Sequence, residues 1–257
     1  MNSILTFIFS LFGLFLFGQI VTDRPTQTTG PTTVPKGIFQ LEAGGVFSND
    51  NGLEGQLQLP SNLFRIGLGK AVELRIVNGL TFNNLNNKVE ASFSNFELGF
   101  KFQLLNKEDK KTQIGVIVHG FTSTGLNSLN IYERGSYVQL AFNHKLNNRN
   151  SIGYNFSYLF SYLGSFDNGN IEQNLSYTLN YAHALTQRLG LFVEVYGWFN
   201  DFVYYDDNNV EFNFNSGLTY LIRDNLQLDY SFGFGILDRM NFQSLGLSFF
   251  IGQQEEK

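Results

Sequence analysis

The stretch Ser151–Leu163, SIGYNFSYLFSYL, decides the fold class of this chain. Every second residue from Ile152 to Tyr162 is aliphatic or aromatic, and most of the residues between them are small or polar. Successive side chains of a β-strand point to opposite faces, so this alternation predicts a strand with one aromatic face and one small, polar face. Such a strand is typical of a membrane barrel whose aromatic face meets lipid.

The same alternation recurs along the chain, for example at 226–236, and it separates twelve predicted strands. Short turns alternate with longer polar connections near 49–56, 83–91, 123–134, 164–170 and 201–209. An even strand number with alternating connection lengths is typical of an antiparallel outer-membrane barrel. A soluble sandwich or lipocalin-like barrel is the alternative, but the aromatic faces are too large to fill its interior. The predicted strands cover residues 38–48, 57–68, 72–82, 92–105, 112–122, 135–146, 151–163, 171–184, 189–200, 210–221, 226–236 and 242–252.

The composition excludes several other classes of protein. The 257 residues are 43% hydrophobic and 15% charged, with 28 Phe and 12 Tyr, yet the chain has no internal apolar run of about 18 residues that a membrane-spanning helix would need. There is no cysteine, which excludes disulfides and thiolate metal sites. The net charge of -5 offers no basic field, so we expect no nucleic-acid partner.

The ends of the chain differ from the strands between them. Residues 4–18 form an apolar stretch followed by polar residues, which predicts a signal peptide at 1–18 with cleavage after Gly18; a retained anchor helix is the alternative. The remaining chain divides into an N-terminal segment at 19–37 that lies in the periplasm or plugs the lumen, a barrel at 38–252 and a polar periplasmic tail at 253–257.

The start of the mature chain carries a family resemblance. Thr22-Asp23-Arg24-Pro25 is followed by Val34-Pro35-Lys36-Gly37 and by Phe39-Gln40-Leu41-Glu42-Ala43-Gly44. In this order the three pieces resemble the family named for the meta-pathway of phenol degradation, whose members are often labelled transporters. The resemblance implies an outer-membrane β-barrel of Gram-negative bacteria with a transport role.

Strand alternation also places a set of charged side chains on the inward face. Acids outnumber bases in this set, which predicts a polar pore with a mild preference for cations. The alternative, which we favour for the members on the first strands, is a salt-bridged structural cluster. The set of predicted lumen-lining residues is Glu42, Arg65, Glu73, Arg75, Glu97, Lys101, His119, Lys145, Glu172, Glu194, Glu211 and Asp229.

Residues 19–37 are too polar for lipid and too rich in Pro and Thr for a strand. We expect this segment inside the lumen or across its mouth, with Arg24 as a plug residue that pairs with Glu42, Glu73 and Glu97. A disordered leader is the alternative.

Motifs for catalysis or metal binding are weak. The chain contains neither a G-x-S-x-G nor an H-E-x-x-H motif. His144 falls on the outward face, where a girdle residue is a better interpretation than the base of a lipid hydrolase. The acidic loop at 201–209 lacks the spaced Gly and Glu of a calcium loop. We therefore predict no enzyme, no cofactor and no metal site.

Together these features predict a twelve-stranded antiparallel transmembrane β-barrel of the Gram-negative outer membrane, with both termini in the periplasm. The predicted function is a porin-like narrow channel or transporter for a small, unidentified solute. The alternative is a non-conducting structural or accessory subunit of an outer-membrane complex. The expected partners are outer-membrane lipid, the small solute and any subunits of such a surface complex.

Overall fold

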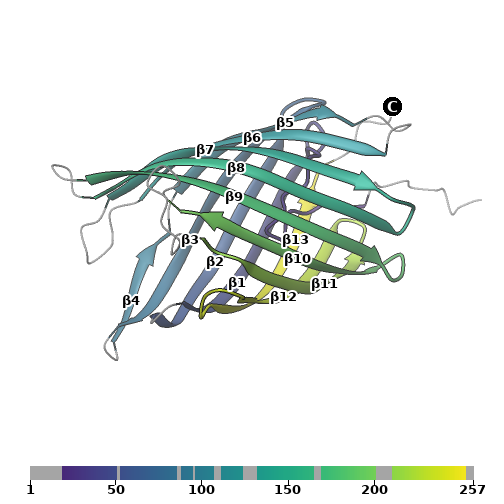
Figure 1. The fold of residues 1–257 in the computed structure, drawn as a ribbon. Helices are drawn as coiled ribbons and strands as arrows, with labels where there is room; N and C mark the ends of the chain where they lie inside the picture. The colour runs from purple at the N-terminus through teal and green to yellow at the C-terminus, as the bar shows by residue number, and fades with distance from the viewer. Residues whose placement is uncertain are drawn as a thin grey trace, which may run out of the picture.

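The computed structural model describes residues 19–50, 53–85, 88–94, 96–106, 111–123, 132–164, 169–200 and 210–252. Strands joined by turns make up nearly all of this part of the chain, as Figure 1 shows. No helix in these ranges is long and apolar enough to cross a membrane. In chain order the strands are β1 (Phe39–Asp50), β2 (Leu53–Gly67), β3 (Val72–Leu85), β4 (Lys88–Phe93), β5 (Phe96–Leu105), β6 (Thr112–Thr122), β7 (Tyr132–Lys145), β8 (Asn150–Gly164), β9 (Gly169–Ala184), β10 (Leu189–Phe199), β11 (Asn213–Arg223), β12 (Leu226–Gly235) and β13 (Asn241–Ile251).

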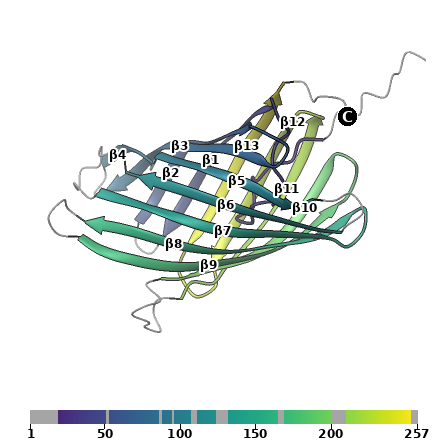
Figure 2. The ribbon, with the colours of Figure 1, turned by 90° about the horizontal axis from the view of Figure 1, so that it is seen from above.

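These strands form one antiparallel sheet that closes on itself. From β5 to β13 each strand pairs with the next, β1 pairs with both β13 and β2, and β2 pairs with β3. The strands are strongly tilted in both views (Figures 1 and 2). Closure leaves the wall of the barrel without a sheet edge, which a wall surrounded by lipid requires.

The short strand β4 and strand β5 together make one interrupted pass of the wall. β4 pairs with the end of β3, where Leu80 faces Phe93, and β5 pairs with the start of β3, where Val77 faces Glu97. The register between the two stretches differs by one residue, as expected for a bulge. Counted in this way, the described strands form twelve passes, and the predicted twelve-stranded antiparallel barrel is confirmed.

The sequence predicted long loops at 49–56 and 83–91, and both predictions are wrong. Strand pairing continues to Asp50 opposite Leu53 and to Leu85 opposite Lys88, so most of 49–56 and 83–91 lies in hairpins. The polar side chains there predicted loops, but they pair across strands instead: the Gln56 amide donates to the side chain of Asn83 at 2.8 Å. Much of the expected loop at 123–134 and all of that at 201–209 lie outside the described residues.

The two faces of the wall have opposite chemistry. On β8 the outward Phe156 is 56% exposed, while its inward neighbour Asn155 is fully buried. On β13, likewise, Leu245 and Leu247 are exposed outward, whereas Ser248 is buried inward. An apolar outer surface around a polar interior is the arrangement of a barrel that spans a lipid bilayer.

Candidate functional site: the segment inside the barrel

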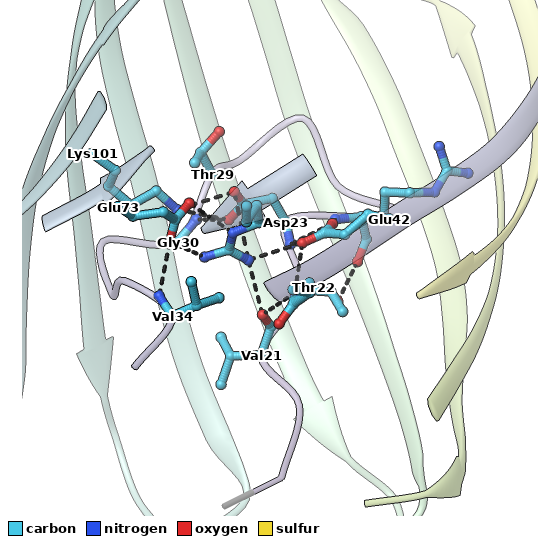
Figure 3. A network of polar contacts seen from close by, with 12 residues as sticks. Val21, Thr22, Asp23, Thr29, Gly30, Val34, Glu42, Glu73 and Lys101 are labelled. Carbon is cyan, nitrogen blue, oxygen red and sulfur yellow. Dashed lines mark hydrogen bonds and ion pairs between the residues drawn. The ribbon is translucent and has the colours of Figure 1, made fainter. Parts of the chain in front are cut away.

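Residues 19–37, which we call the inner segment, run through the interior of the barrel (Figure 3). Hydrogen bonds join the inner segment to strands on opposite sides of the wall, for example from the backbone amide of Asp23 to Glu42 on β1 and from that of Thr29 to Asn155 on β8. Such bonds satisfy the polar groups of a stretch that has no ladder of its own. Among the described residues, no group of three or more acidic or histidine side chains is placed to hold a metal ion.

Asp23 is the central acid of the inner segment. Its Oδ2 lies 2.7 Å from Nη1 of Arg75 on β3 and 3.0 Å from Nζ of Lys101 on β5. Its Oδ1 accepts a hydrogen bond from the backbone amide of Gly30 at 3.1 Å, which folds the segment back on itself. Asp23 therefore ties the inner segment to two strands and to its own later turn.

Arg65 on β2 holds the acids of the wall around Asp23. Its Nη1 lies 2.8 Å from Oε1 of Glu42, and its Nε and Nη2 donate to the two carboxylate oxygens of Glu73 at 2.8 and 2.9 Å. The same guanidinium donates to the carbonyls of Val21 and Thr32 in the inner segment. This bidentate geometry suits arginine and would be lost with lysine.

The resulting cluster, which we call the ion cluster, is balanced in charge and almost fully buried. It contains the acids Asp23, Glu42 and Glu73 and the bases Arg65, Arg75 and Lys101. Buried charges are tolerated when they are paired and hydrogen-bonded, and removal of one partner leaves an uncompensated charge. The barrel wall supplies all three bases but only two of the acids. The inner segment supplies the third.

The acidity of Asp23 links this cluster to pH. Burial would raise the pKa of Asp23, but Arg65, Lys101 and Arg75 outweigh burial and hold this pKa well below its ordinary value of 3.8. A carboxyl whose pKa is lowered by folding stabilises the folded state above its unfolded pKa, and this contribution is lost as the pH falls.

We expect the wild-type barrel to lose stability below about pH 4 more steeply than an Asp23→Asn variant, because the variant has no proton to take up at this position. Urea unfolding of both proteins in micelles from pH 7 to 2.5 measures the difference. Parallel profiles below pH 4 would contradict the role given to Asp23.

Arg24 does not pair with Glu42, Glu73 and Glu97 in the way that the sequence analysis expected. Its Nη2 lies 3.3 Å from Oδ1 of Asp229 on β12 and donates to Oγ of Ser244 on β13 at 2.7 Å. The expected acids are engaged elsewhere, because Arg65 takes both Glu42 and Glu73, and Glu97 meets His119. Only the backbone amide of Arg24 reaches Glu42.

Two glycines make room for the Arg24 guanidinium. Gly44 on β1 and Gly246 on β13 are register partners, and a Cβ at either position would overlap the Arg24 side chain. Other inward glycines have the same relation to the inner segment: a Cβ at Gly67 would overlap Pro35, and one at Gly115 would overlap Pro31. Glycines of the wall thus leave the space through which the inner segment runs.

A second anchor lies on the opposite wall. Glu194 on β10 receives hydrogen bonds from the backbone amides of Gln27 and Thr28 at 2.8 and 2.6 Å, and from the hydroxyl of Thr28. Asn155 accepts from the amide of Thr29 at 2.7 Å and donates to its carbonyl at 3.0 Å. The middle of the inner segment is therefore held across the lumen from the ion cluster.

The ends of the inner segment meet in a small apolar core. Ile20, Val34 and Ile38 are buried together with Leu221 and Phe250 of the wall. The amide of Ile20 donates to the carbonyl of Asp224, in the short turn between β11 and β12. This core lies at the end of the barrel that carries the short turns.

A cavity of about 460 Å³ lies on the other side of the inner segment. Gln27 and Thr29 of the segment contribute to its lining, and the remaining lining residues come from strands β5 to β10. Four aromatic side chains of the inward face line it, from three strands: Phe121, Tyr137, Tyr196 and Trp198. The other lining residues are Glu97, Glu133, Gln139, Ser157, Leu159, Ser176, Tyr177, Thr178 and Gly197.

The remaining predicted residues lie at various depths. His119 is buried, with Nδ1 3.0 Å from Oε2 of Glu97. Lys145 is exposed at the end of β7, Glu172 is half-buried on β9, and Glu211, just before β11, accepts a hydrogen bond from the Asn200 side chain at 2.8 Å. These last three stand apart from the ion cluster.

His144 has the surroundings of a structural residue. Its Nδ1 lies 2.9 Å from the hydroxyl of Thr112, its Nε2 lies 3.1 Å from that of Tyr154, and the Tyr154 ring stacks on the imidazole. Both ring nitrogens are thus engaged by neighbouring hydroxyls. Neither partner is the carboxylate that would orient a catalytic base.

Comparisons with known proteins agree with this architecture. A family model described as "Putative MetA-pathway of phenol degradation" matches residues 22–249. An outer membrane channel from Pseudomonas putida F1 is 12% identical, with a TM-score of 0.61, and the match covers 88% of this chain and all of that one. The NanC porin is 9% identical, with a TM-score of 0.57, over 81% of this chain and 98% of the porin.

The KdgM porin, solved in complex with disordered oligogalacturonate, is also 9% identical, with a TM-score of 0.53, over 82% of this chain and 98% of the porin. No curated protein matches the sequence. Likeness at such low identity establishes the fold, which is the transmembrane β-barrel of outer-membrane channels. Because the family model covers nearly all of the barrel together with most of the inner segment, the chain belongs to the family described as "Putative MetA-pathway of phenol degradation".

Proposed function

We propose that the barrel conducts a small solute across the outer membrane of a Gram-negative bacterium, with both termini in the periplasm. The observation that carries this proposal is the aromatic cavity, which ends at Gln27 and Thr29 of the inner segment. Ligand sites in proteins are typically clefts of this size with a few convergent polar groups. A solute in the cavity would contact the inner segment, and its passage through the barrel requires that segment to shift.

The lengths of the connections support this orientation. The apolar core around Ile20 lies at the short turns, which face the periplasm in barrels of this kind. The cavity then lies nearer the external side, where the long connections lie. Single-channel recording of the purified protein in a planar bilayer tests conduction directly.

We expect the conducted ions to be mainly cations. The acids of the wall that contact the inner segment, which are Glu42, Glu73, Glu194 and Asp229, outnumber the bases Arg65, Arg75 and Lys101 around it. Reversal potentials in a KCl gradient should show a cation preference that increases at low salt, because screening weakens the field of the lumen. An anion preference would contradict the assignment of charges to the inward face.

A non-conducting accessory subunit is the second candidate. The hydrogen bonds that hold the inner segment across the whole lumen favour it. In that case neither the full chain nor a form lacking the inner segment would show the conductance that a channel requires.

A further inference from the structure

A relay of three side chains leads from the ion cluster to the cavity. Nε of Arg75 donates to Nε2 of His119 at 3.1 Å, so this ring nitrogen carries no proton. Nδ1 of His119 then holds the proton and donates to Oε2 of Glu97 at 3.0 Å. A doubly protonated ring would point an N–H at the Arg75 guanidinium. The geometry therefore assigns His119 as neutral.

The carboxyl group of Glu97 therefore meets an uncharged hydrogen-bond donor where it lines the cavity. Its partner His119 orients the carboxylate with one neutral hydrogen bond and supplies no counter-charge. Two neighbours hold the imidazole ring of His119 in this orientation. The ring lies over Gly99, its register partner, where a Cβ would overlap it. Tyr137 stacks on the ring, with the two centroids 4.8 Å apart. Tyr137 and Glu97 both line the cavity.

The rest of the lining suits an organic cation. The described residues around the cavity include two carboxylates, Glu97 and Glu133, and no Lys or Arg. Aromatic rings attract cations through their negative faces, and Trp and Tyr do so more strongly than Phe. An anionic solute would find no positive partner among these described residues, and a neutral solute would leave Glu97 facing only the uncharged donor His119.

We infer that this cavity is a binding site for small organic cations, in which an ammonium group pairs with Glu97 and its apolar body lies among Tyr137, Tyr196 and Trp198. The inference rests on the proposed channel function, because it names the solute class that the lumen accepts.

The single tryptophan of the chain gives a local probe. Trp198 lines the cavity, so its emission, excited at 295 nm where tyrosine absorbs little, reports binding at this site. We would titrate the purified protein with benzylammonium, benzyl alcohol and benzoate, which share a ring and differ in charge. Benzylammonium should give a saturable change at a Kd about tenfold lower than that of benzyl alcohol, and benzoate should give none.

Two variants test the role of Glu97. Glu97→Gln keeps an oxygen that accepts the His119 N–H, and it should weaken benzylammonium binding about tenfold while leaving benzyl alcohol unchanged. Asp238→Asn removes a carboxylate from a turn outside the cavity, so it is a control with the same loss of charge. Thermal unfolding establishes that both variants are folded.

The outcomes separate this inference from the channel proposal. If Glu97→Gln does not change affinity, if benzyl alcohol or benzoate binds as tightly as benzylammonium, or if none of the three changes Trp198 emission, the cation site is wrong. Bilayer conductance is scored independently. Conductance without selective binding overturns the site alone, whereas selective binding without conductance overturns the channel alone.

Discussion

Replacement of Asp23 by Ala is expected to lower the free energy of unfolding by about 3–5 kcal/mol, because it breaks a buried network by removing one partner. Arg75 and Lys101 would then have one acid fewer between them, and Gly30 would lose the acceptor of its backbone amide. The inner segment would also leave the wall more often, so channel openings should become more frequent. Urea unfolding in micelles and single-channel recording measure the two effects.

Matched variants show whether the effect belongs to the ion cluster. Thr33→Ala changes the same segment at a residue that contacts Gln103 through its backbone amide, a bond that alanine keeps, so it should leave both readouts nearly unchanged. Arg24→Ala removes a more exposed ion pair, with Asp229, and should have an intermediate effect. An Asp23→Ala barrel as stable as the Thr33→Ala barrel would rule out Asp23 as the main anchor.

Deletion of residues 20–34 is expected to give the largest change in conductance. A closed protein whose open state lies a few kcal/mol higher is open about 0.1–10% of the time, and the deletion makes opening permanent. The time-averaged conductance should therefore rise by about 10- to 1000-fold. Planar-bilayer recording at matched protein density measures this rise.

A synthetic peptide of residues 19–37 provides the control for the deletion. Added on the periplasmic side, it should reduce the conductance of the deleted form, because its contacts with Glu42, Glu73 and Glu194 can form again. A version of the peptide with Asn at position 23 should block less well. If the deleted barrel conducts no better than the full chain, the inner segment does not close the lumen.

The strands could be predicted from the sequence because one physical rule governs all of them. Lipid outside and polar groups inside impose an alternation with period two, which is visible at Ser151–Leu163 and identifies the inward carboxylates and guanidinia by parity. This alternation does not predict the parts of the strands that extend beyond the lipid. There the strands continue through polar residues that look like loop sequence, such as Gln56 and Asn83, whose side chains pair across two strands.

The partners inside the lumen could not be predicted in the same way. The inner segment has no periodicity, so its path depends on many contacts at once, and the role of Asp23 was missed although it lies beside Arg24 in the quoted T-D-R-P motif. Arg24 was predicted to pair with Glu42, Glu73 and Glu97, but Arg65 holds the first two and His119 contacts the third. The inward glycines were a signal that went unused, since Gly44 and Gly246 leave the space that Arg24 fills.

The unequal share of acids in the ion cluster gives the barrel two electrostatic states. With the inner segment in place, Asp23 completes a neutral set of six groups. When the segment leaves, Arg65, Arg75 and Lys101 face only Glu42 and Glu73, so this zone of the wall acquires one net positive charge. Asp229 on β12, two strands from β1, loses Arg24 at the same time and becomes an unpaired anion beside this zone. An opened barrel thus carries a positive and a negative patch side by side on its inner wall, and an ion or dipolar solute that passes them experiences a local field that the closed barrel does not have.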